Sequence, residues 1–251
     1  YVAAKARILD AAGAEGLVVI GTGPHLDPLA DARRKAGGKV SIINPSDAPA
    51  TIAGVASLAG PHNAENAAAA AACLAALGLA EDEIAEGMAG FAGLPHRLQT
   101  VASHGGISFV NDSKATNGVA AAKALAAFDN VYWIAGGEAK EDGLGEAAGE
   151  TAKVAHAYLI GSAAQAFAAE LDGIVETSLS GDLETATTSA FADASAATGT
   201  DGRDATILLS PAAASFDQFA SFVARGDAFT AIARRLAADA GAAAVQGGAH
   251  A

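Results

Sequence analysis

Two lysines set among small polar residues are the side chains best suited to chemistry in this sequence. Lys114 stands in Asn-Asp-Ser-Lys-Ala-Thr-Asn at 111–117, and Lys140 ends Gly-Gly-Glu-Ala-Lys at 136–140. They are two of only 15 basic residues in a chain of 251. An ammonium group beside exposed backbone amides and a helix N-terminus binds phosphate or carboxylate. The residues by themselves therefore predict a site for a small anionic ligand.

A third polar segment follows an apolar run. It is Leu-Ser-Pro-Ala-Ala-Ala-Ser-Phe-Asp-Gln-Phe at 209–219. Each of the three clusters also has a purely structural interpretation. Asp112 or Ser113 can cap the helix that follows, Gly136–Gly137 can form a tight turn, and Ser215 can begin a helix. These interpretations leave the placement of the two loop lysines unexplained.

Alternating strands and helices must position these clusters in the second part of the chain. The strands expected from short apolar runs are 101–104, 107–110, 131–135, 157–161, 173–176 and 205–210. Alanine-rich stretches predict helices at about 117–127, 145–153, 162–171, 183–197 and 216–238. This alternation is typical of a parallel sheet covered on both faces, in which ligands bind at the carboxyl ends of the strands. The three polar clusters follow such ends.

The first part of the chain, 1–93, alternates too little to complete an open parallel sheet by itself. We expect a helix at 2–12, a strand at 17–20, a helix at 27–36, a strand at 40–43 and a short helix within 80–91. Asn63 is the expected N-cap of a long alanine-rich helix that ends at Gly78. A Gly/Ala-rich tail from residue 241 is expected to be flexible.

Composition argues against several classes of protein. The net charge is -13, and no cluster of lysine and arginine offers a surface for nucleic acid. No apolar run reaches membrane length and no export signal opens the chain, so a cytoplasmic protein without a membrane partner is expected. The one cysteine, Cys73, excludes an internal disulfide, and its helical surroundings predict a packing role.

Five ordered segments resemble signature segments of the Mur ligases, which form amide bonds with ATP. The segments are Gly-Pro-His-Asn-Ala-Glu-Asn at 60–66, Leu-Pro-His-Arg at 94–97, and the clusters at 111–117, 136–140 and 209–219. The resemblance covers about 1–236 and is strongest from 58 to 227. Within the family, the segments are most similar to those of members that add D-glutamate.

The resemblance implies a fold and an activity. It assigns 94–240 to a Rossmann-like, doubly wound and mostly parallel domain, and 1–93 to the last part of the α/β central ATPase domain. It implies an ADP-forming ligase that joins D-glutamate to UDP-N-acetylmuramoyl-L-alanine, a peptidoglycan precursor, through an acyl phosphate. ATP and Mg²⁺ are the implied cofactors, and a monomer is expected.

Residue by residue, the resemblance assigns the implied binding roles. The residues implied to contact the nucleotide are His62, Asn63, Asn66, Arg97 and Asp112. Lys114 would face phosphate or the reacting carboxyl group, and Lys114 and Asp112 are the implied catalytic residues. The implied D-glutamate pocket consists of Thr116, Lys140, Ser215, Phe216 and Phe222. No metal ligand is assigned, because the family's Mg²⁺-binding residues precede the matching region.

The sequence contains no G-x-x-x-x-G-K-[ST] loop, the element that cradles the β- and γ-phosphates of a bound nucleotide. The UDP-binding domain also has no counterpart in it. We therefore expect that the isolated chain cannot form the acyl phosphate. Two other interpretations remain open: a Mur or folylpolyglutamate-type ligase with a different acceptor, and a non-catalytic module that binds nucleotides or anions.

Overall fold

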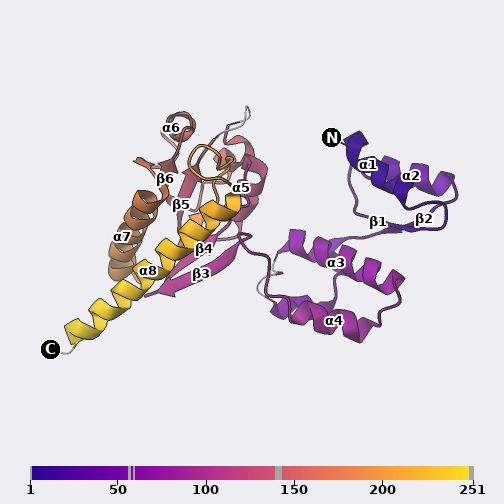
Figure 1. Cartoon of the computed structure of the whole chain (residues 1–251), viewed down its shortest axis with the longest axis horizontal. Helices are drawn as coiled ribbons and strands as arrows, with labels where there is room; N and C mark the ends of the chain where they lie inside the picture. Colours follow the sequence, from indigo (N-terminus) through magenta and orange to yellow (C-terminus); the bar gives the residue numbers. More distant parts are fainter. Residues whose placement is uncertain (1, 56–57, 59, 139–142, 249–251) are drawn as a thin grey trace. The chain divides into compact units, whose positions relative to one another are not determined.

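The computed structural model describes residues 2–55, 58, 60–138 and 143–248 (Figure 1). The chain divides into two units with separate internal contacts, Tyr1–Gly93 (unit 1) and Leu94–Ala251 (unit 2). Each unit is described by itself.

The described residues of unit 1 form a small parallel sheet and four α-helices. Strands β1 (Leu17–Ile20) and β2 (Lys39–Ile42) pair in parallel, which requires the crossover helix between them. The helices are α1 (Val2–Ala11), α2 (Asp27–Lys35), α3 (Pro61–Ala76) and α4 (Glu81–Ala89), with 3-10 turns η1 (Pro45–Asp47) and η2 (Ala50–Gly54). Its buried core joins α3 to α4 through Ala67, Ile84 and Met88.

The start of α3 differs from the expectation. Its N-cap is Gly60, with φ of 92°, and Pro61 is the first helical residue, so Asn63 lies inside the first turn and is not the cap. Proline suits this position because its fixed φ is helical and its missing N–H would have no helical partner there. The helix ends at Ala76, and Gly78 follows with φ of 94°, as a glycine beyond a terminus is expected to do.

Unit 2 is built on a six-stranded sheet with the order β3-β4-β8-β5-β6-β7. The strands are β3 (Gln99–His104), β4 (Ile107–Asn111), β5 (Val131–Gly136), β6 (Val154–Ile160), β7 (Thr177–Gly181) and β8 (Ala205–Leu209). Among these six strands, the hairpin β3–β4 is antiparallel and the other neighbouring pairs run parallel. The predicted mostly parallel sheet is confirmed.

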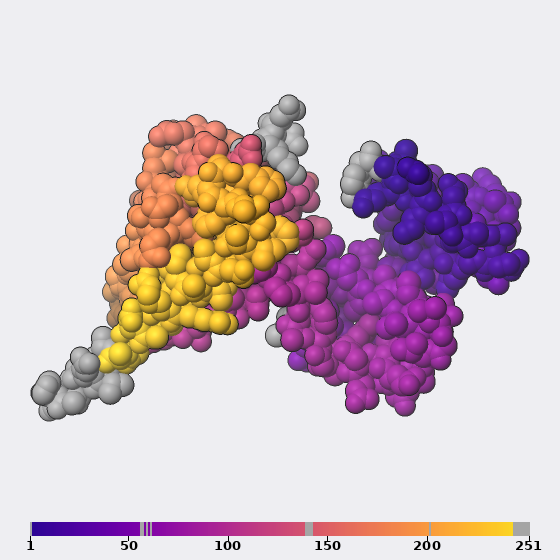
Figure 2. Space-filling model, viewed as in Figure 1, coloured from indigo at the N-terminus to yellow at the C-terminus, as the bar shows by residue number. Residues whose placement is uncertain are grey.

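Helices cover both faces of this sheet because side chains alternate along each strand. Trp133 and Leu159 point to the face under α5 (Gly118–Ala126), η4 (Gly145–Gly149) and α6 (Ala164–Leu171). Phe109 and Ile134 point to the face under α7 (Leu183–Asp201) and α8 (Phe222–Gly248). The surface of α8 adjoins that of α7 on this second face (Figure 2). The predicted doubly wound architecture is therefore also confirmed.

Three expected elements of unit 2 are wrong in their limits. The apolar run 173–176 is a turn, and the edge strand β7 follows it, because an edge strand needs little apolar surface and Ile174 is exposed. The helix expected at 145–153 is only the 3-10 helix η4, which starts at Gly145 with φ of 50°. Helix α8 begins at Phe222 instead of 216, and it continues to Gly248, beyond the expected end at 238. Its alanine content favours that extension. The expected flexibility of the tail stays a prediction.

Among the helices that the structure describes, none is both long and apolar enough to traverse a lipid bilayer.

Candidate functional site

The polar clusters found in the sequence follow three neighbouring strands. Strands β4, β8 and β5 are adjacent and parallel, so their carboxyl ends share one edge, here called the rim. The loop after β4 carries 112–117, the loop after β5 starts at 137, and residues 211–221 join β8 to α8. This last segment is called the strap. Backbone hydrogen bonds from Asp112 N to Leu209 O (2.8 Å) and from Gly136 N to Pro211 O (2.8 Å) link the three.

A buried arginine, Arg225 on the first turn of α8, ties the rim together. In the described part of the chain its guanidinium donates to Ser113 Oγ and O (both 3.0 Å), Ala213 O (3.1 Å), Ala214 O (3.2 Å) and Gly136 O (3.4 Å). The acceptors lie in the β4 loop, in the strap and at the last residue of β5. Arg225 therefore holds in register the loops that carry the candidate site residues.

Arg225 is fully buried, and burial lowers its pKa to about 10, with the charge of Asp217 acting in the opposite direction. It remains charged at neutral pH, because its carbonyl partners replace the lost hydration. The sequence interpretation missed this residue. The available signal was an arginine on the expected apolar face of an alanine-rich helix, three residues after Phe222, and periodicity alone does not distinguish such an arginine from a surface one.

Asp112 sits buried at the end of β4 with both carboxylate oxygens engaged. Oδ2 accepts from Ser210 Oγ at 2.9 Å, and Oδ1 accepts from Leu98 N at 3.3 Å. Burial raises its pKa to about 7, against the lowering effects of Ser210, Leu98 and the nearby charge of Arg97. The alternative that Asp112 or Ser113 caps helix α5 is wrong, because Asn117 Oδ1 accepts from Ala120 N at 2.9 Å.

His96 and Asn111 form a buried polar pair beneath the rim. Asn111 Nδ2 lies 3.1 Å from His96 Nδ1 and donates to Gly226 O at 2.8 Å and Thr230 Oγ1 at 3.0 Å. A Cβ on Gly226 would collide with the His96 ring, so glycine is required where α8 meets it. His96 Nε2 faces Asp227 Oδ1 at 3.6 Å. His96 therefore attaches the start of unit 2 to α8, and Asn111 attaches the end of β4 to it.

Lys114 is exposed and lies over an aromatic ring. Its Nζ is 4.0 Å from the ring centroid of Phe222, a cation–π geometry, and its backbone N donates to His96 O at 3.1 Å. Phe222 is half-buried, and its carbonyl accepts from Ser113 Oγ at 2.8 Å. Two predicted residues from distant parts of the sequence are thus in direct contact.

The remaining residues of the predicted D-glutamate pocket differ in exposure. Ser215 is 2% exposed, whereas Phe216 beside it is 71% exposed. Thr116 is half-buried, and its backbone N donates to Lys114 O at 2.9 Å. The alternative that Ser215 begins a helix is wrong, because α8 starts seven residues later, at Phe222. Lys140 lies outside the described residues, so its position relative to Lys114 stays a prediction.

The predicted nucleotide residues of unit 1 lie on α3. His62 and Asn66 are exposed and Asn63 is half-buried. Their spacing of three and four residues places them on one side of the helix. Glu65 of the same turn lies so close to Gly21, just past β1, that a Cβ on Gly21 would collide with its carboxylate. The first turns of α3 therefore lie beside the carboxyl end of β1.

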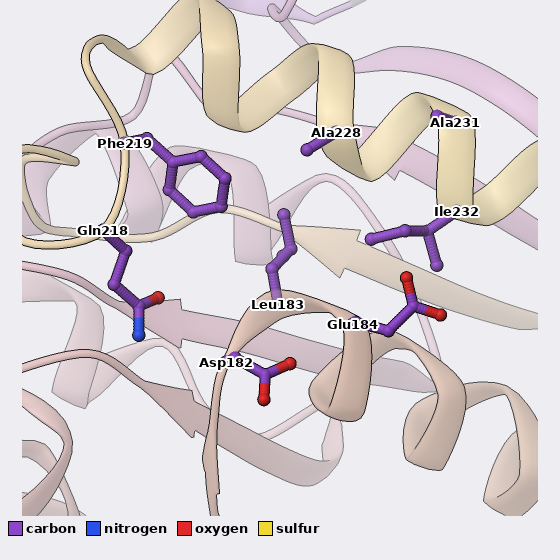
Figure 3. A pocket seen from close by; sticks show the side chains of 8 residues that line it. All are labelled: Asp182, Leu183, Glu184, Gln218, Phe219, Ala228, Ala231 and Ile232. Atoms are coloured by element: carbon purple, nitrogen blue, oxygen red, sulfur yellow. The ribbon is translucent and has the colours of Figure 1, made fainter.

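A groove of about 650 Å³ lies between α7, α8 and the far end of the strap. Its lining consists of Asp182, Leu183, Glu184, Gln218, Phe219, Ala228, Ala231 and Ile232 (Figure 3). The groove is mostly apolar and is open between the start of α7 and the middle of α8. It shares only the far end of the strap with the predicted site, whose residues lie on the open rim.

Among the described residues, no group of three or more His, Cys, Asp or Glu side chains is arranged to hold a metal ion.

Comparison with known proteins identifies the class to which this fold and rim belong. Residues 96–213 match the Mur ligase, glutamate ligase domain. The matched region contains all of β3 to β8 and the first part of the strap. The chain belongs to the Mur ligase family.

Curated relatives share the name UDP-N-acetylmuramoylalanine–D-glutamate ligase. The chain is 48% identical over 178 residues to the one from Rhizobium meliloti (strain 1021), with 71% of this chain and 38% of the relative covered. It is 39% identical over 259 residues to the one from Nitrobacter winogradskyi, with 94% and 55% covered. The chain thus spans about half or less of the length of these relatives.

Solved structures share the fold at low sequence identity. Folylpolyglutamate synthase from Mycobacterium tuberculosis, complexed with ADP and AMPPCP, matches with a TM-score of 0.62 at 19% identity, over 86% of this chain and 55% of that one. MurF from Acinetobacter baumannii matches with a TM-score of 0.59 at 15% identity, over 92% and 54%.

Proposed function

We propose that this chain is the amino-acid-accepting part of an ADP-forming ligase that adds D-glutamate to UDP-N-acetylmuramoyl-L-alanine, in the cytoplasm. One observation carries the proposal: Arg225 joins the β4 loop to the strap. The β4 loop contains Asp112 and Lys114, and the strap contains Ser215. The relatives' shared name supports the choice of substrates.

Asp112 supplies the nucleotide side of the proposed site. It accepts two hydrogen bonds from described residues, and a carboxylate has about four lone-pair sites, so it retains capacity for ribose hydroxyls. Arg97 follows His96 on the same approach to the rim and lies close enough to lower the pKa of Asp112. In this proposal His62, Asn63 and Asn66 of unit 1 contact the base.

Lys114 supplies positive charge on the acceptor side. Its ammonium is exposed to ligand while the Phe222 ring limits where it can lie. We assign it to the reacting carboxyl group or to phosphate, where developing negative charge must be neutralised. Thr116, Ser215, Phe216 and Phe222, with Lys140, form the proposed pocket for D-glutamate, whose two carboxylates require cationic and hydrogen-bonding partners.

ATP and Mg²⁺ belong to the proposed reaction. The carboxylate of Asp112 fits a ribose, as its unused acceptor capacity indicates. The described residues offer no metal-ligand cluster, so we assign no Mg²⁺ ligand to them. When bound, ATP and Mg²⁺ supply the phosphoryl group and charge neutralisation, and this chain's residues orient the substrates and the acceptor.

An NMR titration of the ¹⁵N-labelled chain tests the proposal. D-glutamate should shift amide signals at Ser215 and Lys140, and Ser215→Ala should weaken binding by about tenfold if it removes one hydrogen bond to a carboxylate. Lys140→Ala is the second variant, and L-glutamate and diaminopimelate are the comparison ligands. Equal binding of L-glutamate would favour a folylpolyglutamate-type acceptor. A response to ADP or phosphate without any to the three amino acids would favour a non-catalytic module.

A further inference from the structure

The strap, residues 211–221, runs along the rim beyond the strand that it leaves. It departs from β8, passes the end of β5, and then reaches the ends of β6 and β7 before α8 begins. A loop that only joined β8 to α8 would not need to contact the segments that follow β5, β6 and β7. The course of the strap therefore requires a physical explanation.

The first attachment is to the β5 loop. Ala214 and Glu138 exchange two backbone hydrogen bonds of 2.9 Å each, an isolated antiparallel bridge. Gly137, with φ of 129°, permits it, because a Cβ there would collide with Ala214 O. The strap is thus joined by one bridge to the segment that follows β5.

The second and third attachments are made by side chains. Asp217 Oδ2 accepts from Ser162 N at 2.9 Å, in the loop after β6. Gln218 Nε2 donates to Gly181 O at 2.7 Å, at the end of β7. The closeness of Asp217 requires glycine at 161, because a Cβ there would collide with its carboxylate. Phe219 adds an apolar contact by packing on the core between α7 and α8 (Figure 3).

Between these attachments the strap carries Ser215 and Phe216, two residues of the predicted D-glutamate pocket. Ser215 O accepts from Phe219 N at 2.7 Å and from Gln218 N at 3.2 Å, which closes a tight turn around Phe216 and Asp217. Ser215 lies inside this turn and Phe216 projects from it. The position of both therefore depends on what holds residues 217–219.

We propose that Asp217 and Gln218 are positioning residues that fasten the strap across the rim and so hold Ser215 and Phe216 in the geometry that accepts D-glutamate. The inference rests on the proposed function for its ligand, whereas the fastening itself rests on the contacts described. The segment Ser-Phe-Asp-Gln-Phe then divides into the two predicted D-glutamate residues, buried Ser215 and exposed Phe216, and three anchors.

Charge argues that Asp217 is not itself a ligand contact. D-glutamate carries two carboxylates, and a third carboxylate facing them would repel them. Asp217 Oδ2 instead accepts from Ser162 N, just before the N-terminus of α6. The helix dipole makes negative charge favourable near this end. Asp217 also stabilises the cationic form of buried Arg225. Both effects fix the loop without contact to substrate.

The test compares Asp217→Ala, Asp217→Asn and Gln218→Ala in the whole 251-residue chain. Asparagine retains an oxygen acceptor for Ser162 N and removes the charge, so it separates hydrogen bonding from electrostatics. We expect Asp217→Ala to weaken D-glutamate binding by about tenfold and Asp217→Asn by less than about threefold. Gln218→Ala should have an intermediate effect. Inorganic phosphate, followed at Lys114, should bind all variants as it binds the unaltered chain.

Amide hydrogen exchange supplies a readout that does not depend on the ligand. Exchange at Phe219 and Ser162 should become faster in Asp217→Ala, with exchange at Trp133 in the core unchanged. Asp239→Asn is the matched control, because Asp239 is an exposed carboxylate on α8 paired only loosely with Arg235 at 3.9 Å. It should change neither binding nor exchange.

Two results would overturn the inference. One is D-glutamate binding to Asp217→Ala at the affinity of the unaltered chain. The other is unchanged amide exchange at Phe219 and Ser162 in Asp217→Ala, which would show that Asp217 does not fasten the strap. Failure of the unaltered chain to bind D-glutamate is a different outcome: it would contradict the proposed function, and the exchange measurement would still decide whether the strap is fastened by these residues.

Discussion

At the scale of single residues, burial controls the chemistry of Asp112. A carboxyl group with a pKa of about 7 is close to half-ionised at neutral pH, whereas an exposed aspartate is almost fully ionised. Ser210 and Leu98 favour the charged form by donating to it, but burial outweighs them. The acceptor capacity of this residue is therefore sensitive to pH in the physiological range.

We predict that ADP binding to this chain strengthens by roughly tenfold between pH 6 and pH 8, as the ionised fraction of Asp112 rises. Ribose hydroxyls donate to the carboxylate, so only the ionised form accepts from both. Isothermal titration calorimetry across this range measures the change in affinity. Asp112→Asn is the control, because any pH dependence that it retains comes from ionisation of ADP and not of Asp112. An identical pH profile in Asp112→Asn would show that another group is responsible.

The same pKa has a consequence for stability with a definite sign. The folded-state value lies above the unfolded value of about 3.9, so Asp112 favours the folded state at low pH, and this contribution is lost as pH rises from about 4 through 7. The difference amounts to at most about 4 kcal/mol. Urea unfolding at pH 5 and pH 8 should show a smaller pH-dependent loss in Asp112→Asn than in the unaltered chain.

At the scale of secondary structure elements, the first turn of α8 organises the rim. Its Arg225 contacts the β4 loop, the strap and the end of β5. Its Phe222 lies under Lys114, and Gly226 leaves room for the His96 ring. These contacts stabilise the fold of unit 2 and also hold the candidate site residues in place. Damage there should affect stability and ligand binding together.

We predict that Arg225→Lys lowers the free energy of unfolding by about 2–4 kcal/mol, because an ammonium cannot reach the carbonyl oxygens served by the planar guanidinium. Arg234→Lys on the same helix is the control, since Arg234 is exposed and makes one long contact of 3.4 Å to Val101 O. It should change stability by less than about 0.5 kcal/mol. Equal stability of the two variants in urea would contradict the role assigned to Arg225.

At the scale of the whole molecule, the two units have cores of very different size. Unit 2 contains both large buried clusters, one on each face of a six-stranded sheet. Unit 1 has a two-stranded sheet and a cluster with only Ala67, Ile84 and Met88 fully buried among its described residues. A small core offsets little of the conformational entropy lost on folding.

We predict that unit 1 unfolds at a lower urea concentration than unit 2. The chain's single tryptophan, Trp133, is buried in unit 2 with Nε1 donating to Ser210 O at 2.8 Å, so its fluorescence reports that unit alone. Circular dichroism reports helices in both. Two steps in circular dichroism, with fluorescence following only the second, are the expected result. Coincident single transitions would show that the units unfold as one.

The elements were largely predictable because local patterns specify them. Alternating apolar strands and alanine-rich helices predicted the mostly parallel sheet, and three polar clusters were correctly expected at strand ends. The errors lie where local signals are weak: the edge strand β7 is polar, and Pro61 displaced Asn63 as the start of α3. Binding roles for Thr116, Ser215, Phe216 and Phe222 remain proposals.

The sequence by itself determined the family, the order of the elements and the chemistry available at 111–117 and 209–219, because these depend on residue types and near neighbours. Only the tertiary structure decided which of these residues meet. Strand β8 inserts between β4 and β5, and this long-range pairing brings together segments about a hundred residues apart. Arg225, Asp217 and Gln218 acquire their roles from that arrangement, because a side chain's partners across loops are set by strand order and not by its own sequence neighbours.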